Sequence, residues 1–376
     1  MEPNWNAQLV LNCPSLNEMI NFFKDELKFR VDTIYPADDP STAIMSGYGM
    51  CIRLERSDLA VSDSCCTIRL SSIDSNVTRD EKTEKVAPNG TKIELVRSSP
   101  NIFIPELVSS FVVSKLDSTT RWIRGRAGME YRDLIPGRQG GRFIASHIRI
   151  LDGGPVPDQV HYHHVRFQLI YIYKGWVRLV YQDQGSSFIL KHGDCVLQPP
   201  TIRHRVLESS PGLEVIELAC PAVHDTHLDH TMELPNKNIS SNLYYGGQRF
   251  VKYIAENDAV EWEPWRITDF QCRRMGIGDA TAGLGEMRFV RAKKFIESNP
   301  NCYQHSGEFV FMFILNGTLT ITIVGEKDVQ LSTGDACVLK ENQTYSFLHW
   351  SDELQLLEVT LPATISTMIN NDSSSN

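Results

Sequence analysis

The chain lacks several features that would place it in a functional class at once. Its 376 residues contain no apolar run of eighteen or more residues, so a membrane-spanning helix is not expected. The net charge is −9, which argues against a nucleic-acid-binding protein, because such proteins usually carry a basic domain or stripe. The first residues, MEPNWNAQLVLNCPS, lack the basic start and apolar core of a secretory signal. We therefore expect a cytoplasmic protein with neither nucleic acid nor a membrane as a partner.

The nine cysteines show none of the short C-x-x-C spacing that is typical of structural zinc sites and redox motifs. Their number is odd, and Cys65 and Cys66 are adjacent, which is poor geometry for a structural disulfide. Reduced, mostly buried thiols are the simplest interpretation, and they agree with a cytoplasmic location.

What the chain does have is a long β-rich region that begins near residue 140. Runs of Ile, Val, Phe and Tyr alternate there with Gly, Pro and Asp at short intervals, a pattern typical of β-sandwiches and β-barrels. The pattern occurs twice: Gly193-Asp lies 28 residues before Pro221, and Gly334-Asp lies 28 residues before Pro362. Equal spacing in the same order indicates a duplicated domain rather than one large barrel.

The first repeat contains the segment HYHHVRFQLIYIYKG, which is rich in metal-binding residue types. His161 and His163 are two residues apart, so on a strand their side chains share one face. Gln168 comes five residues later and would face the other way unless the chain bends between them. His204 follows a turn-rich segment and can approach from a neighbouring strand. Imidazole suits Zn, Fe, Ni and Cu, and an amide oxygen is a weaker, neutral donor.

These residues, with the glycines and proline around them, resemble the two sequence motifs of the cupin family. The frame consists of Gly154, Gly175, Gly193 and Pro199. Three positions depart from the usual motifs: Gln168 stands where Glu is usual, Thr201 where Gly is usual, and Glu208 where Asn is usual. The resemblance covers about residues 116–362 and is that of a bicupin. It implies a mainly β protein with two cupin jelly-roll barrels in tandem.

The cupin resemblance also implies the ligands of one divalent metal ion per chain. They are His161, His163, Gln168 and His204. We expect Fe²⁺, with Mn²⁺, Ni²⁺ and Zn²⁺ as alternatives. Aligning the second repeat places Tyr303, His305, Val310 and Tyr345 at the corresponding positions. One imidazole does not hold a divalent ion stably, so the second barrel is predicted to be metal-free.

Residues 7–58 have a different pattern, with an amphipathic helix after one strand and before three others. This β-α-β-β-β order resembles a half-module of the glyoxalase/bleomycin-resistance (vicinal oxygen chelate) family, and it predicts a small α+β module. A short helix is also predicted in the segment STTRWIRGRAGMEYRDL, residues 118–134. The predicted divisions are 1–58 (glyoxalase-like module), 59–115 (irregular linker), 116–235 (first cupin), 236–365 (second cupin) and 366–376 (disordered tail).

The sequence does not identify catalytic residues. Polar side chains on or beside strands of the first repeat could line its pocket: His147, Arg149, Arg166, Arg178, Tyr181 and Gln198. We expect a metal-dependent dioxygenase that acts on a small, anionic organic substrate. The alternatives are an isomerase or lyase of the bicupin type, and a non-catalytic protein that binds a small ligand or metal. The uncovered sheet edges and concave face of the N-terminal half-module suggest a homodimer.

Overall fold

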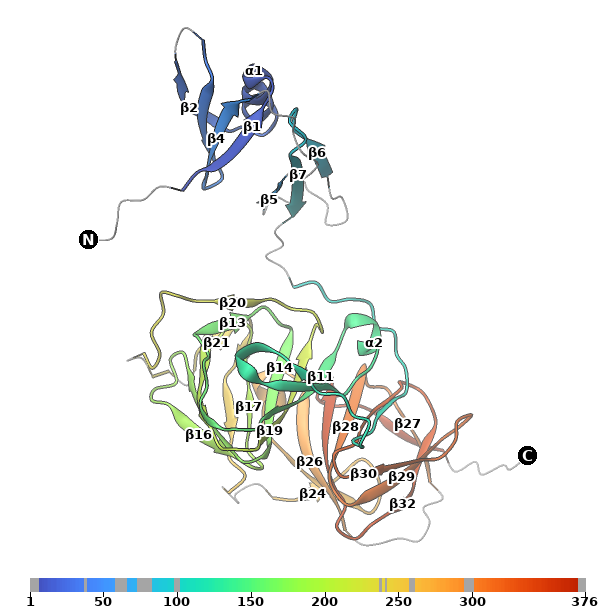
Figure 1. Ribbon diagram of the computed structural model, residues 1–376. Helices are drawn as coiled ribbons and strands as arrows, with labels where there is room; N and C mark the ends of the chain where they lie inside the picture. Colours follow the sequence, from blue (N-terminus) through green and yellow to red (C-terminus); the bar gives the residue numbers. More distant parts are fainter. Residues whose placement is uncertain are drawn as a thin grey trace. The chain divides into compact units, whose positions relative to one another are not determined.

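The structure is a computed structural model, and it describes residues 7–36, 39–57, 66–72, 83–97, 102–236, 239–240, 242–256, 261–293 and 301–370. The chain divides into two compact units, Met1–Asn101 and Ile102–Asn376 (Figure 1). Strands dominate both units, as the sequence predicts. Of the helices in the described part of the chain, none has the length and apolar character needed to cross a membrane.

The first unit begins with the predicted β-α-β-β-β order. Its elements are β1 (Leu9–Cys13), α1 (Leu16–Asn21), the π-helix η1 (Phe22–Glu26), β2 (Arg30–Tyr35), β3 (Thr42–Gly47) and β4 (Met50–Arg56), and the sheet order is β1-β4-β3-β2. The Ser15 hydroxyl accepts a hydrogen bond from the Glu18 amide, so the helix begins with a side-chain cap. Met19 and Phe23 are fully buried in the apolar core that the helix shares with the sheet.

The same unit contains a second sheet, in a segment for which the sequence predicts an irregular linker. Its strands are β5 (Thr67–Ser72), β6 (Thr83–Val86) and β7 (Lys92–Arg97), in the order β5-β7-β6. Ile68 and Ile93 are buried and belong to the core of the first unit. The strands are short, and in β5 and β7 apolar residues are interspersed with charged ones, so the stretch as a whole has a polar composition.

The second unit consists of two β-barrels, the first at residues 123–253 and the second at 263–370 (Figure 1). In the first, a seven-stranded sheet has the order β23-β17-β14-β19-β11-β10-β9 and a six-stranded sheet comprises β16-β15-β18-β13-β20 with β12 beside β18. The bounds are β9 (Ile123–Arg124), η2 (Arg126–Gly128), β10 (Glu130–Asp133), α2 (Arg138–Gly141), β11 (Ile144–Ile150), β12 (Gly154–Pro155), β13 (His161–His163), β14 (Phe167–Lys174), β15 (Trp176–Tyr181), β16 (Phe188–Lys191), β17 (Cys195–Leu197), β18 (His204–Ser209), β19 (Leu213–Cys220), β20 (Thr226–Leu228) and β23 (Val251–Tyr253), with a separate hairpin of β21 (Tyr244–Tyr245) and β22 (Gln248–Arg249).

The second barrel repeats this arrangement. One sheet has the order β24-β25-β26-β33-β28-β31-β8 and the other β30-β29-β32-β27-β34. The bounds are β8 (Val112–Ser114), β24 (Glu263–Pro264), β25 (Phe270–Arg274), α3 (Ile277–Ala280), β26 (Glu286–Ala292), β27 (Cys302–His305), β28 (Phe309–Asn316), β29 (Thr318–Ile323), β30 (Val329–Ser332), β31 (Ala336–Leu339), β32 (Tyr345–Trp350), β33 (Gln355–Leu361) and β34 (Thr367–Asn370). Strand β8 precedes the first barrel in the chain but pairs with β31 of the second.

The strand register confirms the internal repeat that the sequence predicts. In the first barrel β13 pairs with β18 so that His161 lies opposite His204. In the second barrel β27 pairs with β32 so that Tyr303 lies opposite Tyr345. The sequence alignment of the two repeats therefore describes equivalent positions in space.

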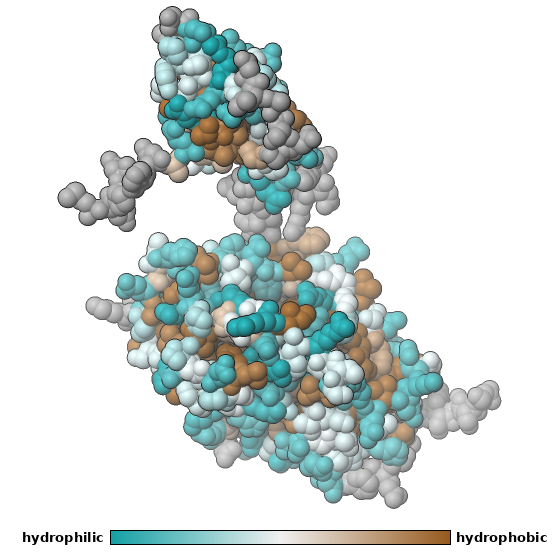
Figure 2. All heavy atoms as spheres, viewed as in Figure 1, coloured by the Kyte–Doolittle hydropathy of each residue, from teal (hydrophilic) through white to brown (hydrophobic). Residues whose placement is uncertain are grey.

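The two seven-stranded sheets share one apolar core. Strand β14 turns Phe167, Leu169 and Tyr171 to one face, and these side chains join residues of the second barrel in a single buried cluster. The rings of Phe143 and Phe309, one from each barrel, stack with centroids 4.1 Å apart. The alternate residues of β14 face the interior of the first barrel, where Ile172 is fully buried. Polar and apolar residues are interspersed over the face of this unit that Figure 2 shows.

Two further segments differ from what the sequence predicts. Residues 118–134 contain the hairpin β9–β10 instead of a helix, and η2 forms its turn. Gly125 fits there because an added Cβ would lie 2.6 Å from the Tyr131 ring. Within the predicted disordered tail, β34 pairs with β27, as β20 pairs with β13 in the first barrel. Residues 371–376 lie outside the described part of the chain.

Candidate metal centre

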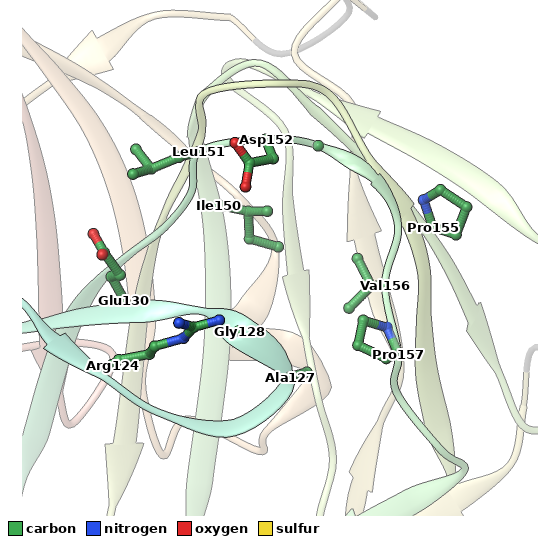
Figure 3. Close-up of a pocket in the computed structure, with 11 residues that line it drawn as sticks. Arg124, Ala127, Gly128, Glu130, Ile150, Leu151, Asp152, Pro155, Val156 and Pro157 are labelled. Carbon is green, nitrogen blue, oxygen red and sulfur yellow. The ribbon is translucent and has the colours of Figure 1, made fainter.

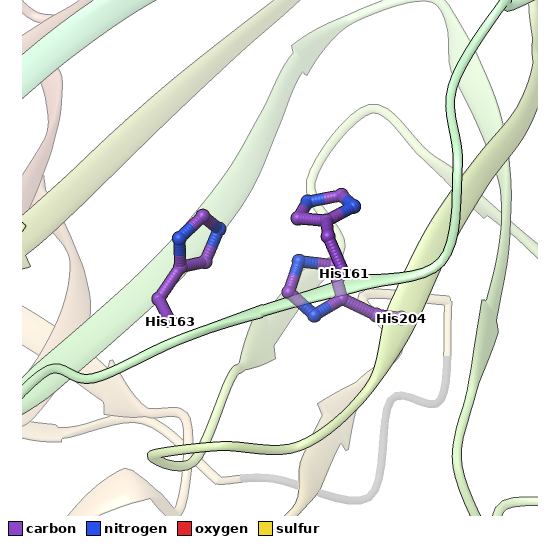
Figure 4. Close-up of side chains that lie close together, drawn as sticks. All are labelled: His161, His163 and His204. Carbon is purple, nitrogen blue, oxygen red and sulfur yellow. The ribbon is translucent and has the colours of Figure 1, made fainter. Parts of the chain in front are cut away.

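Three buried histidines converge inside the first barrel (Figure 4). His161 and His163 come from β13, and His204 is the first residue of β18. One ring nitrogen of each histidine lies within 4.8 Å of the other two. The exposed fractions are 2%, 9% and 4%, so the three imidazoles face the interior and not solvent. These are the three histidines that the sequence analysis selects as metal ligands.

Backbone carbonyl groups fix the orientation of all three rings. The Nδ1 atom of His161 lies 2.7 Å from the Gln159 carbonyl oxygen. His163 Nδ1 lies 3.2 Å from the Asp225 carbonyl oxygen, and His204 Nδ1 lies 3.0 Å from that of Ile202. A carbonyl only accepts, so Nδ1 carries the proton and Nε2 keeps its lone pair. This is how metal-binding histidines are usually held by their surroundings.

Two side-chain contacts support the same tautomers independently. The Nη2 atom of Arg126 lies 3.1 Å from His161 Nε2, and a guanidinium only donates hydrogen bonds. The Gln198 amide oxygen accepts from Tyr181 Oη at 2.5 Å, which turns the amide nitrogen toward His204 Nε2 at 3.5 Å. Both contacts require an unprotonated Nε2. The donor set fits a divalent transition metal, since it consists of neutral imidazole lone pairs.

Burial keeps these imidazoles neutral near pH 7. Burial lowers the pKa of His161, and it lowers the pKa of His163 to about 3, with further lowering by His161 and His224. Burial also holds the pKa of His204 well below the usual value. Protons therefore compete weakly with a metal ion for these lone pairs over most of the acid range.

Gln168 lies on β14, in the other sheet from β13, and the chain turns at residues 164–166 between the two strands. This is the bend that the sequence analysis requires before Gln168 can share the barrel interior with His163. The Gln168 side chain is buried, and its amide nitrogen donates to Glu217 Oε1 at 2.6 Å. The amide oxygen is therefore the atom of Gln168 that remains for a metal ion.

Of the predicted pocket residues, only Tyr181 and Gln198 are brought to the histidines. The Tyr181 and His204 rings stack with centroids 5.5 Å apart. Arg178 pairs with Glu208, and both side chains are more than a third exposed. Arg166 pairs with Glu308 of the second barrel.

Two further predicted pocket residues also make their contacts away from the histidines. Arg149 pairs with Glu130 and lies 3.9 Å from the centroid of the Trp122 ring. His147 Nε2 lies 2.7 Å from Glu214, and its ring meets Phe313 of the second barrel.

Three polar residues of the site are not singled out by the sequence. Arg126, on η2, contacts His161 and forms an ion pair with the buried carboxylate of Asp158. Asp158 also accepts a hydrogen bond from the Val206 amide at 2.9 Å, which fixes it against β18. Glu217 holds Gln168. The alternation of β19 places Glu217 on the face opposite Glu214 and toward the interior.

A pocket of about 280 Å³ lies beside the loop that carries Arg126 (Figure 3). Ala127 and Gly128 form one wall, and Val156 and Pro157 form another. The charged residues on its lining are Arg124, Glu130 and Asp152. The three histidines do not line this pocket, so it is not the metal centre. The η2 loop contributes to both, since Ala127 and Gly128 line the pocket and Arg126 contacts His161.

The equivalent place in the second barrel has a different chemistry. Tyr303 and Tyr345 occupy the positions of His161 and His204, and Val310 occupies that of Gln168. A guanidinium stands among them, because Arg266 donates to Tyr345 Oη. Phenols, an apolar side chain and a positive charge do not favour a bound cation.

Comparisons with known proteins identify the fold of the second unit. No protein-family profile matches the chain, and no curated protein matches its sequence. Among solved structures, salicylate 1,2-dioxygenase from Pseudaminobacter salicylatoxidans is similar, with 15% identity and a TM-score of 0.51 over 71% of this chain and 90% of that one. A variant of the same dioxygenase in complex with gentisate gives 16% identity and a TM-score of 0.50, over 72% and 88% of the two chains.

A second kind of enzyme shows the same likeness. A deletion variant of Bacillus subtilis oxalate decarboxylase gives 14% identity and a TM-score of 0.50, over 72% of this chain and 82% of that one. Identities this low support the fold and not the activity. The chain therefore has the bicupin fold, and its first barrel contains a buried histidine triad that is consistent with a cupin metal site.

Proposed function

We propose that the protein is a metal-dependent bicupin enzyme, a dioxygenase that acts on a small, anionic organic substrate. The convergence of His161, His163 and His204 carries this proposal. Three neutral imidazoles held by backbone carbonyls, with Gln168 as the fourth ligand, are compatible with Fe²⁺, the ion that a dioxygenase would use, and also with Mn²⁺, Ni²⁺ and Zn²⁺. An ion bound there would supply Lewis-acid or redox chemistry.

Arg126 is the residue that favours an anionic substrate. Its guanidinium lies beside the ring nitrogen that would bind the metal, and its side chain is 42% exposed, so it links the buried site to the surface. Asp158 pairs with Nη1 of the guanidinium, and Nη2, which contacts His161 Nε2 in this structure, would become available to a carboxylate once a metal ion takes that nitrogen. Tyr181 and Gln198 close the opposite side of His204 with packed, hydrogen-bonded side chains and limit the entry of water.

The isomerase or lyase alternative is supported by the neutral amide of Gln168. A ligand without charge leaves the ion a stronger electrophile and donates less electron density for oxygen activation. The structural likeness to oxalate decarboxylase, at the level of fold, is also compatible with lyase chemistry. The third alternative is a protein that binds a ligand or metal without catalysis.

Oxygen uptake and carbon dioxide release together distinguish a dioxygenase from a decarboxylating lyase and both from the remaining functions. The Fe²⁺-loaded full-length protein is mixed with salicylate, gentisate and oxalate in turn, and both oxygen uptake and carbon dioxide release are recorded, with His204→Ala as the control. Uptake that requires His204 supports the dioxygenase. Carbon dioxide release without oxygen uptake would support a lyase instead. Neither signal from a fully loaded protein, across a wider panel of small carboxylates, would argue against a dioxygenase and a decarboxylating lyase, and would leave an isomerase or non-catalytic binding.

A further inference from the structure

Glu217, on β19, is an acidic side chain that points into the interior of the first barrel. Strand alternation turns Leu213, Val215 and Glu217 to one face of β19. Leu213 and Val215 belong to the apolar cluster inside this barrel. Burial and, after it, the nearby Glu217 raise the pKa of Tyr131 and that of the fully buried Tyr181. The Glu217 carboxyl group therefore lies among side chains of the barrel interior.

This carboxyl group has no cationic partner in the part of the chain that the structure describes. Its side-chain hydrogen bond comes from Gln168 Nε2, which donates to Glu217 Oε1 at 2.6 Å. No arginine, lysine or histidine of the described residues forms an ion pair with it. A charge that is removed from water is unfavourable unless it is compensated. A positive charge is therefore expected in this interior, into which the three neutral histidines also point.

The hydrogen bond from Gln168 determines which end of the amide faces Glu217. A carboxylate only accepts hydrogen bonds, so the amide nitrogen has to be the atom beside it. The opposite orientation of the amide would place two acceptor oxygens 2.6 Å apart. Glu217 therefore turns the Gln168 oxygen, and not its nitrogen, away from itself and keeps it available to a metal ion.

Glu217 also supplies the kind of charge that the first repeat lacks at position 168. Gln168 stands where the cupin motif usually has Glu, and a neutral amide is a weaker donor to a cation than a carboxylate. Strands β14 and β19 are neighbours, and Ile170 lies opposite Glu217 in their pairing. A carboxylate that accepts a hydrogen bond from a metal ligand makes that ligand a stronger donor, as it does for metal-binding histidines. The pair thus offers one amide oxygen and one negative charge, divided between two side chains.

We propose that Glu217 is a positioning residue of the metal centre. It holds the oxygen of Gln168 toward the ion and supplies the negative charge that a glutamate ligand would bring. This role rests on the proposed function, since it requires that the histidine triad binds a metal ion. It also bears on the type of reaction, because the added electron density offsets the neutral amide that favours an isomerase or lyase.

Zinc affinity tests this role without depending on activity. Full-length wild type, Glu217→Gln and Glu214→Gln are compared by competition with a chelating dye for Zn²⁺, which has no redox chemistry. Circular dichroism shows that each protein is folded. We expect Glu217→Gln to weaken Zn²⁺ binding roughly 10- to 100-fold, because a glutamine there has no charge and does not fix the Gln168 amide. Glu214→Gln is the matched control, on the opposite face of the same strand beside His147, and should leave the affinity unchanged.

A second variant exchanges the two side chains. Gln168→Glu/Glu217→Gln returns the carboxylate to the ligand position and keeps the hydrogen bond with donor and acceptor reversed. It should restore Zn²⁺ affinity to the wild-type value or above it, because the charge and the hydrogen bond are both present again. A purely structural role of Glu217 predicts no such restoration.

The possible results separate this proposal from the metal centre itself. Equal Zn²⁺ affinity in wild type and Glu217→Gln would overturn the role of Glu217 and leave the metal centre intact. A weakened Glu217→Gln whose affinity the exchange does not restore would also overturn it, since Glu217 would then act independently of Gln168. A wild type that binds no Zn²⁺ would overturn the metal centre and this role with it.

Discussion

The low pKa of His163 makes a quantitative prediction about acid stability in the absence of metal. An exposed histidine has a pKa near 6.5, and burial lowers that of His163 to about 3. Between these two values the unfolded chain binds a proton that the folded chain does not bind, so stability falls as the pH decreases from about 6.5. From pH 7 to pH 5 this single group should lower the free energy of unfolding by about 2 kcal/mol.

Urea unfolding of the wild type and of His163→Asn, in chelator at pH 7 and at pH 5, measures this contribution. Tryptophan fluorescence is a suitable signal, because five of the six tryptophans lie at or after residue 122. The loss of stability between the two pH values should be smaller in His163→Asn by about 2 kcal/mol. An equal loss in both proteins would refute the conclusion that His163 is buried in its neutral form. His164→Asn is the matched control, since this neighbouring ring is only partly buried.

Two further predictions concern the polar side chains around the triad. Gln168→Leu should weaken Fe²⁺ or Zn²⁺ binding roughly 10- to 100-fold without abolishing it, as measured by competition with a chelating dye; unchanged affinity would remove Gln168 from the ligand set. Arg126→Met should leave the metal content unchanged and weaken the binding of salicylate to the metal-loaded protein roughly 10- to 100-fold by calorimetry, because a charge-assisted hydrogen bond is lost. Equal salicylate affinity in Arg126→Met and wild type would show that the guanidinium does not bind the anion.

The histidine triad could be predicted from the sequence because its geometry depends on strand periodicity. His161 and His163 are two residues apart on one strand, so their side chains share a face regardless of how the other strands are arranged. The repeated spacing of glycine and proline predicts which strand carries His204. The alignment that placed Tyr303 and Tyr345 in the second barrel is confirmed by their pairing across β27 and β32 for the same reason.

Arg126 could not be predicted, because its place depends on a turn. The segment around it has the composition of a short helix, but Gly125 lies against the Tyr131 ring and η2 reverses the chain between two strands. The contact with His161 also requires Asp158, which lies 32 residues away in the sequence. Contacts of this kind arise from tertiary packing and leave no periodic signal in the sequence.

The sequence also does not predict on which side of the strand, barrel interior or exterior, the side chains of Arg149, Arg166 and Arg178 lie. Alternation along a strand gives two faces, but it does not say which one is the barrel interior when both carry apolar residues. In this protein both faces of β14 are buried, one inside the barrel and one against the second barrel. The ion pair between Arg166 and Glu308 crosses between the two barrels, and only the assembled fold identifies it.

Metal analysis of the purified protein shows whether the histidine triad of the first barrel binds a metal ion. The wild type and the His161→Ala/His204→Ala variant are loaded anaerobically with Fe²⁺, desalted and measured by elemental analysis, with circular dichroism to show that both are folded. We expect about one ion per wild-type chain and none in the variant, since one remaining imidazole and an amide do not hold a divalent ion. A wild type that stays empty after loading, or a folded variant that retains a full equivalent of metal, would contradict this expectation.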